Sequence, residues 1–142
     1  MKTTILFTGS PGSGKTILIR IGISRLSMPV GGFYTQEIRQ TGVRKGFGIV
    51  TLDGQHGLLA HVNNQSRHRV GKYGVDIDAL EGLALPAIVD AAAKRWLVII
   101  DEIGPMEILS AYFCQAVLEI LDERASVLGS IVQRSMPFTD QV

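Results

Sequence analysis

The sequence predicts an α/β protein, and three observations carry that prediction. A complete G-x-x-x-x-G-K-[ST] loop lies between a predicted strand and a predicted helix. A later apolar strand ends in two adjacent carboxylates. The intervening chain, at about residues 32–62, has the alternation and turn residues of an antiparallel meander. Together they predict a P-loop NTPase fold, in which three α/β/α layers (helices, sheet, helices) include a mostly parallel sheet that carries an inserted β-meander. At 142 residues the chain is expected to form one domain, residues 1–142.

The loop comprises eight consecutive residues, Gly9, Ser10, Pro11, Gly12, Ser13, Gly14, Lys15 and Thr16. The β-branched stretch 3–8 before it predicts a strand, and the near-helical spacing of apolar residues over 17–26 predicts a helix. In that context the glycines let backbone N–H groups surround phosphates at a helix N-terminus. Lys15 is expected to reach the β- and γ-phosphates and Thr16 to ligate Mg²⁺. A glycine-rich turn before an ordinary helix is the alternative, but chance produces the pattern in well under ~1% of such chains.

The second motif is the apolar strand 96–100, followed by Asp101 and Glu102. Asp101 is expected to hold Mg²⁺ together with Thr16, and Glu102 to orient and deprotonate the attacking water. Solvated acids at a strand end are the alternative reading. The adjacent glutamate favours a RecA-like sheet in which an additional strand separates the loop strand from the acidic strand. The segment 127–133 is the candidate, and Ser130 or Gln133 within it could sense the γ-phosphate.

The remaining elements follow from turn residues and periodicity. Strands are expected at 33–39, 46–51 and 57–62, and a mobile polar loop at 63–72. Asp76 is expected to cap a helix that Pro86 kinks or divides. A helix is expected from about Met106 to Glu123.

Phosphoryl transfer also favours a cation opposite the γ-phosphate. Arg44, in the meander, and Arg134, after the last strand, are the candidates. The alternative is that both arginines are solvated surface charges with no role in catalysis.

Composition narrows the class of protein further. A formal net charge of +1 gives no nucleic-acid or membrane signature. The lone Cys114 excludes an internal disulfide and suits a reducing compartment. The apolar run 96–100 is too short to span a membrane, and the first residues do not resemble a secretory signal. We expect a soluble, cytoplasmic protein that is a monomer.

With both motifs in place, the chain resembles the small P-loop nucleoside-triphosphatase family known from thermophiles and from the human cancer-related NTPase. The resemblance runs from Thr3 to about Phe138, and its specific segments are Gly32–Thr35 and Asp101–Glu107. It implies Mg²⁺-dependent hydrolysis of ATP, GTP, CTP and UTP to NDP and phosphate with little base selectivity. It also implies that family members continue past Val142 with a further helix and strand.

Two other functions fit the same motifs. One is a P-loop nucleoside or nucleotide kinase, for which only residues 67–69 resemble an arginine-rich lid. The other is an NTP-dependent switch or adaptor in which slow hydrolysis times a partner interaction. Glu102 beside Asp101 favours water as the acceptor.

Overall fold

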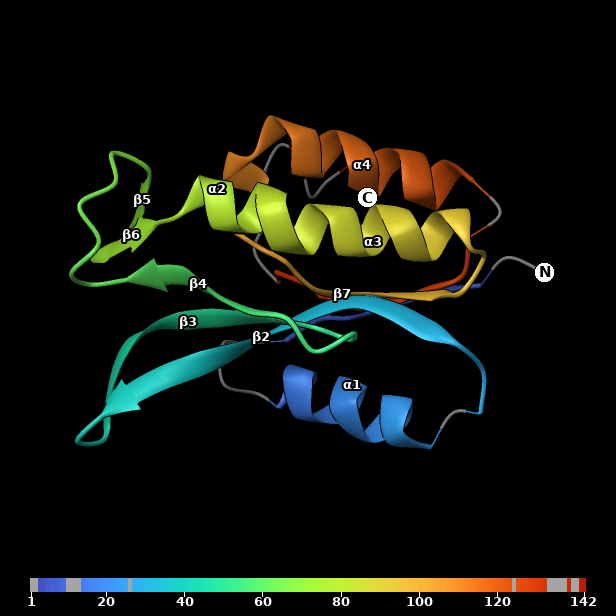
Figure 1. Cartoon of the computed structure of the whole chain (residues 1–142), viewed down its shortest axis with the longest axis horizontal. Coiled ribbons are helices and arrows are strands. Elements are labelled where there is room, and N and C mark those ends of the chain that lie inside the picture. Colours follow the sequence, from blue (N-terminus) through green and yellow to red (C-terminus); the bar gives the residue numbers. More distant parts are fainter. Residues whose placement is uncertain (1–2, 10–13, 26, 124, 133–137, 139–140) are drawn as a thin grey trace.

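The computed structural model describes residues 3–9, 14–25, 27–123, 125–132, 138 and 141–142 (Figure 1). The strands are β1 (Thr4–Phe7), β2 (Val30–Gln40), β3 (Val43–Thr51), β4 (His56–His61), β5 (Arg69–Val70), β6 (Tyr73–Val75), β7 (Leu97–Ile103) and β8 (Val127–Ile131). The helices are α1 (Lys15–Ser24), α2 (Ile77–Ala79), a π-helical turn η1 (Leu80–Ala84), α3 (Leu85–Ala93), a 3₁₀ turn η2 (Glu107–Leu109) and α4 (Ala111–Asp122).

The described strands form one mixed sheet in the order β1-β8-β7-β2-β3-β4-β6-β5. Neighbours from β1 to β2 are parallel, and those from β2 onward are antiparallel. The additional strand expected between the loop strand and the acidic strand is present: β8 pairs with β1 on one side and with β7 on the other. The carboxyl ends of β1, β7 and β8 therefore meet at one edge of the sheet.

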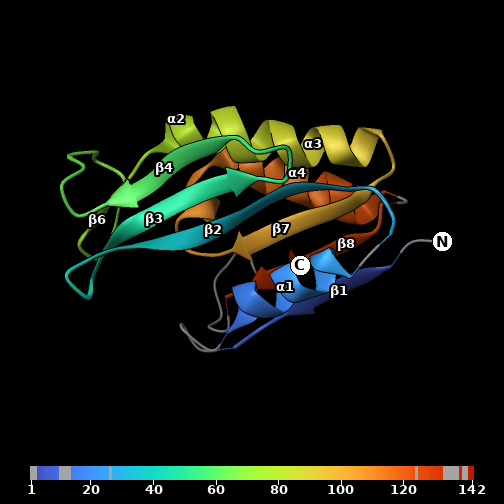
Figure 2. The ribbon, with the colours of Figure 1, turned by 60° about the horizontal axis from the view of Figure 1, so that its bottom comes forward.

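Helices cover both faces of this sheet. α1 lies on one face, and α3 and α4 lie side by side on the other (Figures 1 and 2). Side chains alternate between the two faces of the sheet along β7, so this continuous apolar strand packs against the helices on both faces. Val98 and Ile100 belong to the core beneath α3 and α4, whereas Leu97 and Ile99 pack with Ile19 of α1.

The meander continues the parallel sheet. The first residues of β2 pair in parallel with β7, with Phe33 opposite Ile100. The same strand then runs on beyond β7 to residue 40 and pairs with β3 along its length. The outer halves of β2 and β3 therefore project past the carboxyl end of β7 (Figure 2).

Two expectations from the sequence were wrong in detail. The segment 63–72 contains the short strand β5, which pairs with β6. The helix expected from Met106 begins only at Ala111, because Ser110 caps it: its Oγ accepts from the Phe113 N–H at 3.0 Å. Residues 107–109 form the separate 3₁₀ turn η2.

The expected cap at Asp76 is confirmed, since its carboxylate accepts from the Ala79 N–H at 2.9 Å. Pro86 lies in the first turn of α3, directly after the π-helical turn, where its missing N–H costs least. The expected division of that helix is therefore present as a change of helical type.

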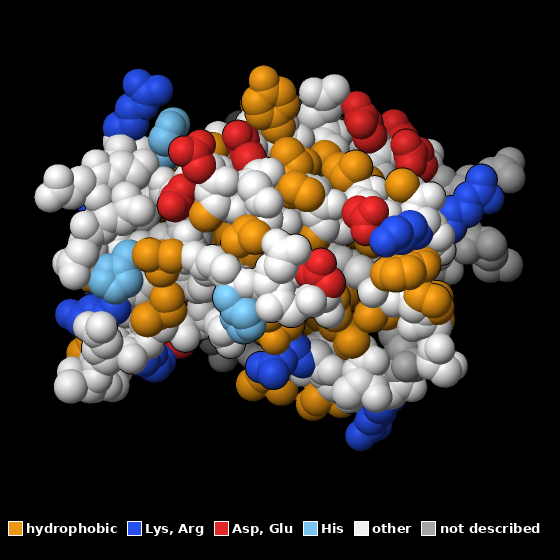
Figure 3. All heavy atoms as spheres, viewed as in Figure 1, with side chains coloured by type: hydrophobic (Ala, Val, Ile, Leu, Met, Phe, Trp, Pro, Cys, Tyr) orange, Lys and Arg blue, Asp and Glu red, His pale blue; other side chains and the backbone are white. Residues whose placement is uncertain are grey.

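In the view of Figure 3 the surface is of mixed charge: acidic side chains gather in the upper part, over α2, α3 and α4, and basic ones are spread over both ends and the lower part. Within the described part of the chain, no helix has the length and apolar character needed to cross a membrane.

Candidate active site

The phosphate-binding motif joins β1 to α1. Gly9 follows β1, and Gly14 precedes the first helical residue with φ +89°, a left-handed conformation that glycine adopts without strain. Ser10, Pro11, Gly12 and Ser13 lie outside the described residues. The described ends of the motif place Lys15 and Thr16 in the first turn of α1, facing the edge where β7 and β8 end.

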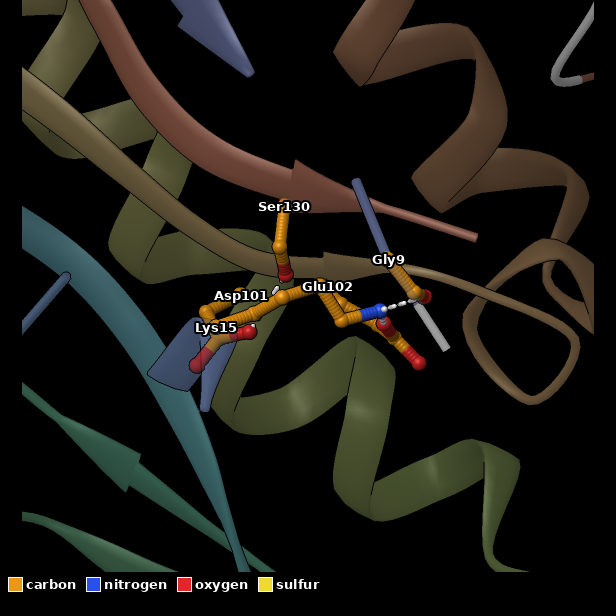
Figure 4. Close-up of polar contacts among 5 residues, drawn as sticks. All are labelled: Gly9, Lys15, Asp101, Glu102 and Ser130. Carbon is orange, nitrogen blue, oxygen red and sulfur yellow. Dashed lines mark hydrogen bonds and ion pairs between the residues drawn. The ribbon is translucent and has the colours of Figure 1, made fainter. Parts of the chain in front are cut away.

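Lys15 bridges the two sequence motifs. Its Nζ donates to the Gly9 carbonyl at 3.2 Å and lies 3.1 Å from Glu102 Oε2 (Figure 4). The Lys15 side chain is 13% exposed and that of Glu102 28%, so water screens this pair only in part. The loop lysine and the second acid of the strand thus form one ion pair.

Asp101 lies deeper, at the end of β7, and is 2% exposed. Ser130 of β8, fully buried, donates from Oγ to Asp101 Oδ1 at 2.5 Å (Figure 4). Burial raises the pKa of Asp101 above its ordinary value, and hydrogen bonds from the side chains of Ser130 and Thr16 oppose that rise. The contact between Thr16 and Asp101 brings together the two residues expected to hold a metal.

The donor set fits a hard divalent cation. The second carboxylate oxygen of Asp101, Oδ2, is buried and has no hydrogen-bond partner among the described residues. A buried carboxylate oxygen without a partner is costly unless a cation or water satisfies it. Thr16 adds a hydroxyl, and carboxylate and hydroxyl oxygens are the ligands that Mg²⁺ takes.

Glu102 sits against the turn that follows β7. A methyl group at Gly104 would lie 2.6 Å from Glu102 Oε1, so the absent side chain of Gly104 leaves room for this carboxylate. Glu102 therefore lies beside the metal-ligand candidate Asp101, with one oxygen on the loop lysine.

Glu107 is a third acid in the same region, and the sequence reasoning did not single it out. Its side chain is 3% exposed, and Oε2 is buried without a hydrogen-bond partner in the described part of the chain. Burial raises the pKa of Glu107 well above its ordinary value of 4.5, and the charge of Glu102 adds to this rise. One signal was available: Glu107 is an acid among the apolar residues Met106, Ile108 and Leu109.

These groups line one cleft of about 1010 Å³. Its lining extends from Lys15 and Thr16, through the acids at the end of β7 and in η2, to the outer halves of β2 and β3 and to β6. Arg44 lines the far part, where its Nη2 lies 2.8 Å from Glu37 Oε1. Arg44 thus lines the same cleft as Lys15 and Thr16, but its ion pair is with Glu37. Arg134 and Gln133 lie outside the described residues.

Ser130, one of the two candidate sensors of the γ-phosphate, contacts Asp101. Among the aromatic residues, Phe33 is fully buried in the core, while Phe47 and Tyr73 line the cleft. Glu37 and Phe47 were not predicted as site residues, because strand pairing, and not a sequence motif, brings them to the cleft.

The fold and the site define an α/β protein with a phosphate-binding-loop motif at the end of its first strand and paired acids on a nearby parallel strand. A family model described as NTPase matches residues 4–142, and the chain belongs to this family. That membership confirms the resemblance seen in the sequence and the expected enzyme class.

Named relatives agree. The chain is 46% identical over 138 residues to nucleoside-triphosphatase THEP1 of Thermotoga sp. strain RQ2, covering 97% of this chain and 79% of the relative. It is 40% identical over 149 residues to the human cancer-related nucleoside-triphosphatase, covering 96% and 76%.

Two solved structures are similar as well. The crystal structure of THEP1 from Aquifex aeolicus has a TM-score of 0.87 at 35% identity, covering 99% of this chain and 83% of that one. The solution structure of the human cancer-related nucleoside triphosphatase has a TM-score of 0.79 at 37% identity, covering 99% and 82%.

Proposed function

We propose that the protein is a Mg²⁺-dependent nucleoside-triphosphatase that hydrolyses ATP, GTP, CTP and UTP to NDP and phosphate with little base selectivity. The observation that carries this proposal is the contact between Lys15 and Glu102. It brings a phosphate-binding cation and a carboxylate suited to general-base catalysis to the same point. The family and the printed names of the relatives support the reaction class.

The roles of the residues follow from their positions. Lys15 and the backbone of the loop bind the β- and γ-phosphates. Thr16 and Asp101 hold Mg²⁺, which when bound neutralises charge on the phosphate oxygens. Ser130 orients Asp101 through its hydrogen bond. Glu102, on the same edge, accepts a proton from the water that attacks the γ-phosphorus.

Nucleotide binding must rearrange the ion pair. In the structure Lys15 is held by Glu102 and Gly9. When the γ-phosphate takes the ammonium group, the Glu102 carboxylate is released toward the position of the attacking water. The same contact therefore keeps the base occupied until a triphosphate arrives.

Low base selectivity follows from the nature of the assigned groups. The residues above contact phosphate and metal, and none supplies a hydrogen-bonding pocket for a particular base. Strong discrimination needs buried polar partners that the wrong base leaves unpaired, which can give ~10⁴–10⁵ in specificity. We therefore propose that kcat/KM for ATP, GTP, CTP and UTP lies within about tenfold, or ~1.4 kcal/mol.

Phosphate release from each of the four triphosphates, with Mg²⁺ and with EDTA, tests the proposal. Lys15→Ala is the matched variant and is expected to abolish hydrolysis while the protein stays folded. Arg20→Ala is the control, because Arg20 contacts Tyr34 and does not line the cleft. Turnover that persists in Lys15→Ala, or a thousandfold preference for one base, contradicts the proposal. Transfer to an added nucleoside in place of phosphate release would favour the kinase alternative.

A further inference from the structure

Part of the cleft is lined by residues other than those assigned to phosphate and metal. Phosphoryl transfer places the attacking and leaving groups roughly in line on opposite sides of the γ-phosphorus. Glu102, the proposed base, marks the attacking side, so the nucleoside diphosphate must extend away from it. The same cleft is also lined by Phe47 and Tyr73, which are not among the residues assigned to the nucleotide.

The size of the cleft agrees with this division. Its volume of about 1010 Å³ reaches the upper end of the roughly 300–1,000 Å³ found for pockets that hold one drug-sized ligand. When phosphates and metal occupy the loop end, the part of the cleft lined by the outer halves of β2 and β3 and by β5 and β6 stays open to a second ligand, and we treat it as a separate compartment.

The walls of this compartment are apolar and aromatic. Phe47 and Tyr73 meet edge to face, with ring centroids 5.3 Å apart and an interplanar angle of 70°. Leu59 and Val70 complete the apolar lining. Such a wall favours a flat ring, because aromatic pairs gain about 0.5–1.5 kcal/mol beyond the area that they bury.

The same compartment carries excess positive charge at its far end. Arg39 Nε and Arg44 Nη2 each lie 2.8 Å from an oxygen of Glu37, so two cations share one carboxylate. The Arg44 guanidinium lies 5.5 Å from the Phe47 ring centroid, and Lys72 Nζ lies 5.6 Å from that of Tyr73.

Arg44 also has an unused donor. Its Nε is buried and has no hydrogen-bond partner within the described residues. A buried donor without an acceptor is costly, and a bound acceptor would remove that cost. At the opposite end of the cleft Asp101 and Glu102 lie with Lys15. The arginines at the far end therefore favour an anionic group there.

We propose that this compartment, which we call the meander pocket (Arg39, Arg44, Phe47, Leu59, Val70 and Tyr73), binds a small aromatic molecule carrying a phosphate or carboxylate group. The ring packs against Phe47 and Tyr73, and the anionic group accepts from Arg44. The inference rests on the proposed function only for the direction in which the nucleotide lies. It adds a second ligand site beside the γ-phosphate.

The test uses 4-fluorophenyl phosphate as the probe, observed by ¹⁹F NMR on the full chain saturated with Mg²⁺ and the non-hydrolysable analogue AMPPNP. Saturable binding is expected with the nucleotide analogue in place. The uncharged 4-fluorobenzyl alcohol is expected to bind at least fivefold more weakly. Arg44→Ala and Phe47→Leu should each weaken probe binding at least fivefold, whereas Arg20→Ala should leave it within twofold of the parent.

Displacement of the probe by Mg²⁺·AMPPNP would overturn the proposal, because the probe would then occupy the triphosphate site. Equal affinities in Arg44→Ala and Arg20→Ala would overturn it too, as would the absence of saturable binding. Circular dichroism confirms folding, and Arg44→Gln replaces Arg44→Ala if the alanine variant does not fold. Phosphate release without the probe is measured separately, so failure of this site is distinguishable from failure of hydrolysis.

Discussion

Lys15 Nζ lies 3.1 Å from Glu102 Oε2, although the two residues are 87 positions apart in the chain. The contact joins the first turn of α1 to the end of β7. The positive charge of Lys15 and the negative charge of Glu102 thus compensate each other at the point where a γ-phosphate would lie. Binding a triphosphate replaces Glu102 by a phosphate as the anionic partner of Lys15. The affinity for the triphosphate therefore depends on the difference in free energy between the Lys15–phosphate and Lys15–Glu102 contacts.

Removing the Ser130 hydroxyl should weaken metal binding. Ser130→Ala takes away the donor to Asp101 Oδ1 in a fully buried setting. Loss of a group that orients a metal ligand commonly costs about 10–100-fold in metal affinity. We expect the Mg²⁺ concentration for half-maximal turnover to rise by about that factor, with turnover at saturating Mg²⁺ changed less.

The control for that titration is Ser24→Ala, because the Ser24 hydroxyl donates to the Ile21 carbonyl on the exposed end of α1. A Mg²⁺ requirement that changes as little in Ser130→Ala as in Ser24→Ala would show that Ser130 does not orient the metal ligand.

Glu107 should make stability depend on pH. The unfolded chain releases this proton near pH 4.5, whereas burial holds the pKa of the folded carboxyl well above that value. Between these two pKa values the folded state binds more protons, so the free energy of unfolding falls as pH rises above about 4.5. Glu107→Gln removes this loss. The free energy of unfolding of the variant minus that of the parent should therefore increase with pH, by up to ~1.4 kcal/mol per pH unit.

Urea unfolding at pH 5, 6 and 7 measures this difference. Glu119→Gln is the matched control, because Glu119 is exposed on α4 and its Oε1 accepts from Gln115 Nε2 at 3.0 Å. A difference between Glu107→Gln and the parent that stays constant across this range means that Glu107 is not held protonated by burial.

The two arginine candidates make separate predictions. A well-placed arginine opposite the γ-phosphate is worth ~10³–10⁵ in kcat. If Arg44 serves in this way it must leave Glu37, so Arg44→Ala lowers kcat at saturating Mg²⁺·ATP and Glu37→Gln does not. Arg134→Ala is measured in parallel. If neither arginine variant lowers kcat by more than about threefold, or ~0.7 kcal/mol, neither residue is an arginine finger.

Local patterns were sufficient to predict the elements that position the site. The glycine-rich loop and the apolar strand that ends in Asp101 and Glu102 are continuous in sequence, so their chemistry could be named from residue types and spacing. The interposed strand β8 was also expected, because an acid next to the metal ligand is typical of that sheet order.

The contacts that hold these residues depend on lateral pairing, which local patterns do not specify. Ser130 meets Asp101 because β7 and β8 are neighbours and the pairing of Ile100 with Gly129 puts the next residues side by side, although the register shifts before Ile103 pairs with Ile131. Arg44 meets Glu37 across the β2–β3 pair, whose register also shifts at Ile38 and Arg39. A shift of one residue changes the face on which a side chain lies, so these pairs could not be predicted from the motifs alone.

Glu107 was missed for a different reason. Helical periodicity fits the whole stretch from Met106 to Glu123, and a helix there would place Glu107 near an exposed N-terminus. The cap at Ser110 divides the stretch, and the 3₁₀ turn before it buries Glu107 in the cleft. The placement of this acid therefore depends on where the helix begins.

The central claim is that Glu102 is the base that activates water and that it is held by Lys15 until a triphosphate binds. The most direct test measures Mg²⁺·ATP affinity and single-turnover hydrolysis in Glu102→Gln. The account predicts that turnover falls by ~10²–10⁴, as expected for loss of a positioned general base. It also predicts that ATP binds at least as tightly as to the parent, because Lys15 no longer has a competing carboxylate. Hydrolysis at the parent rate, or ATP binding weakened as in Lys15→Ala, would contradict it.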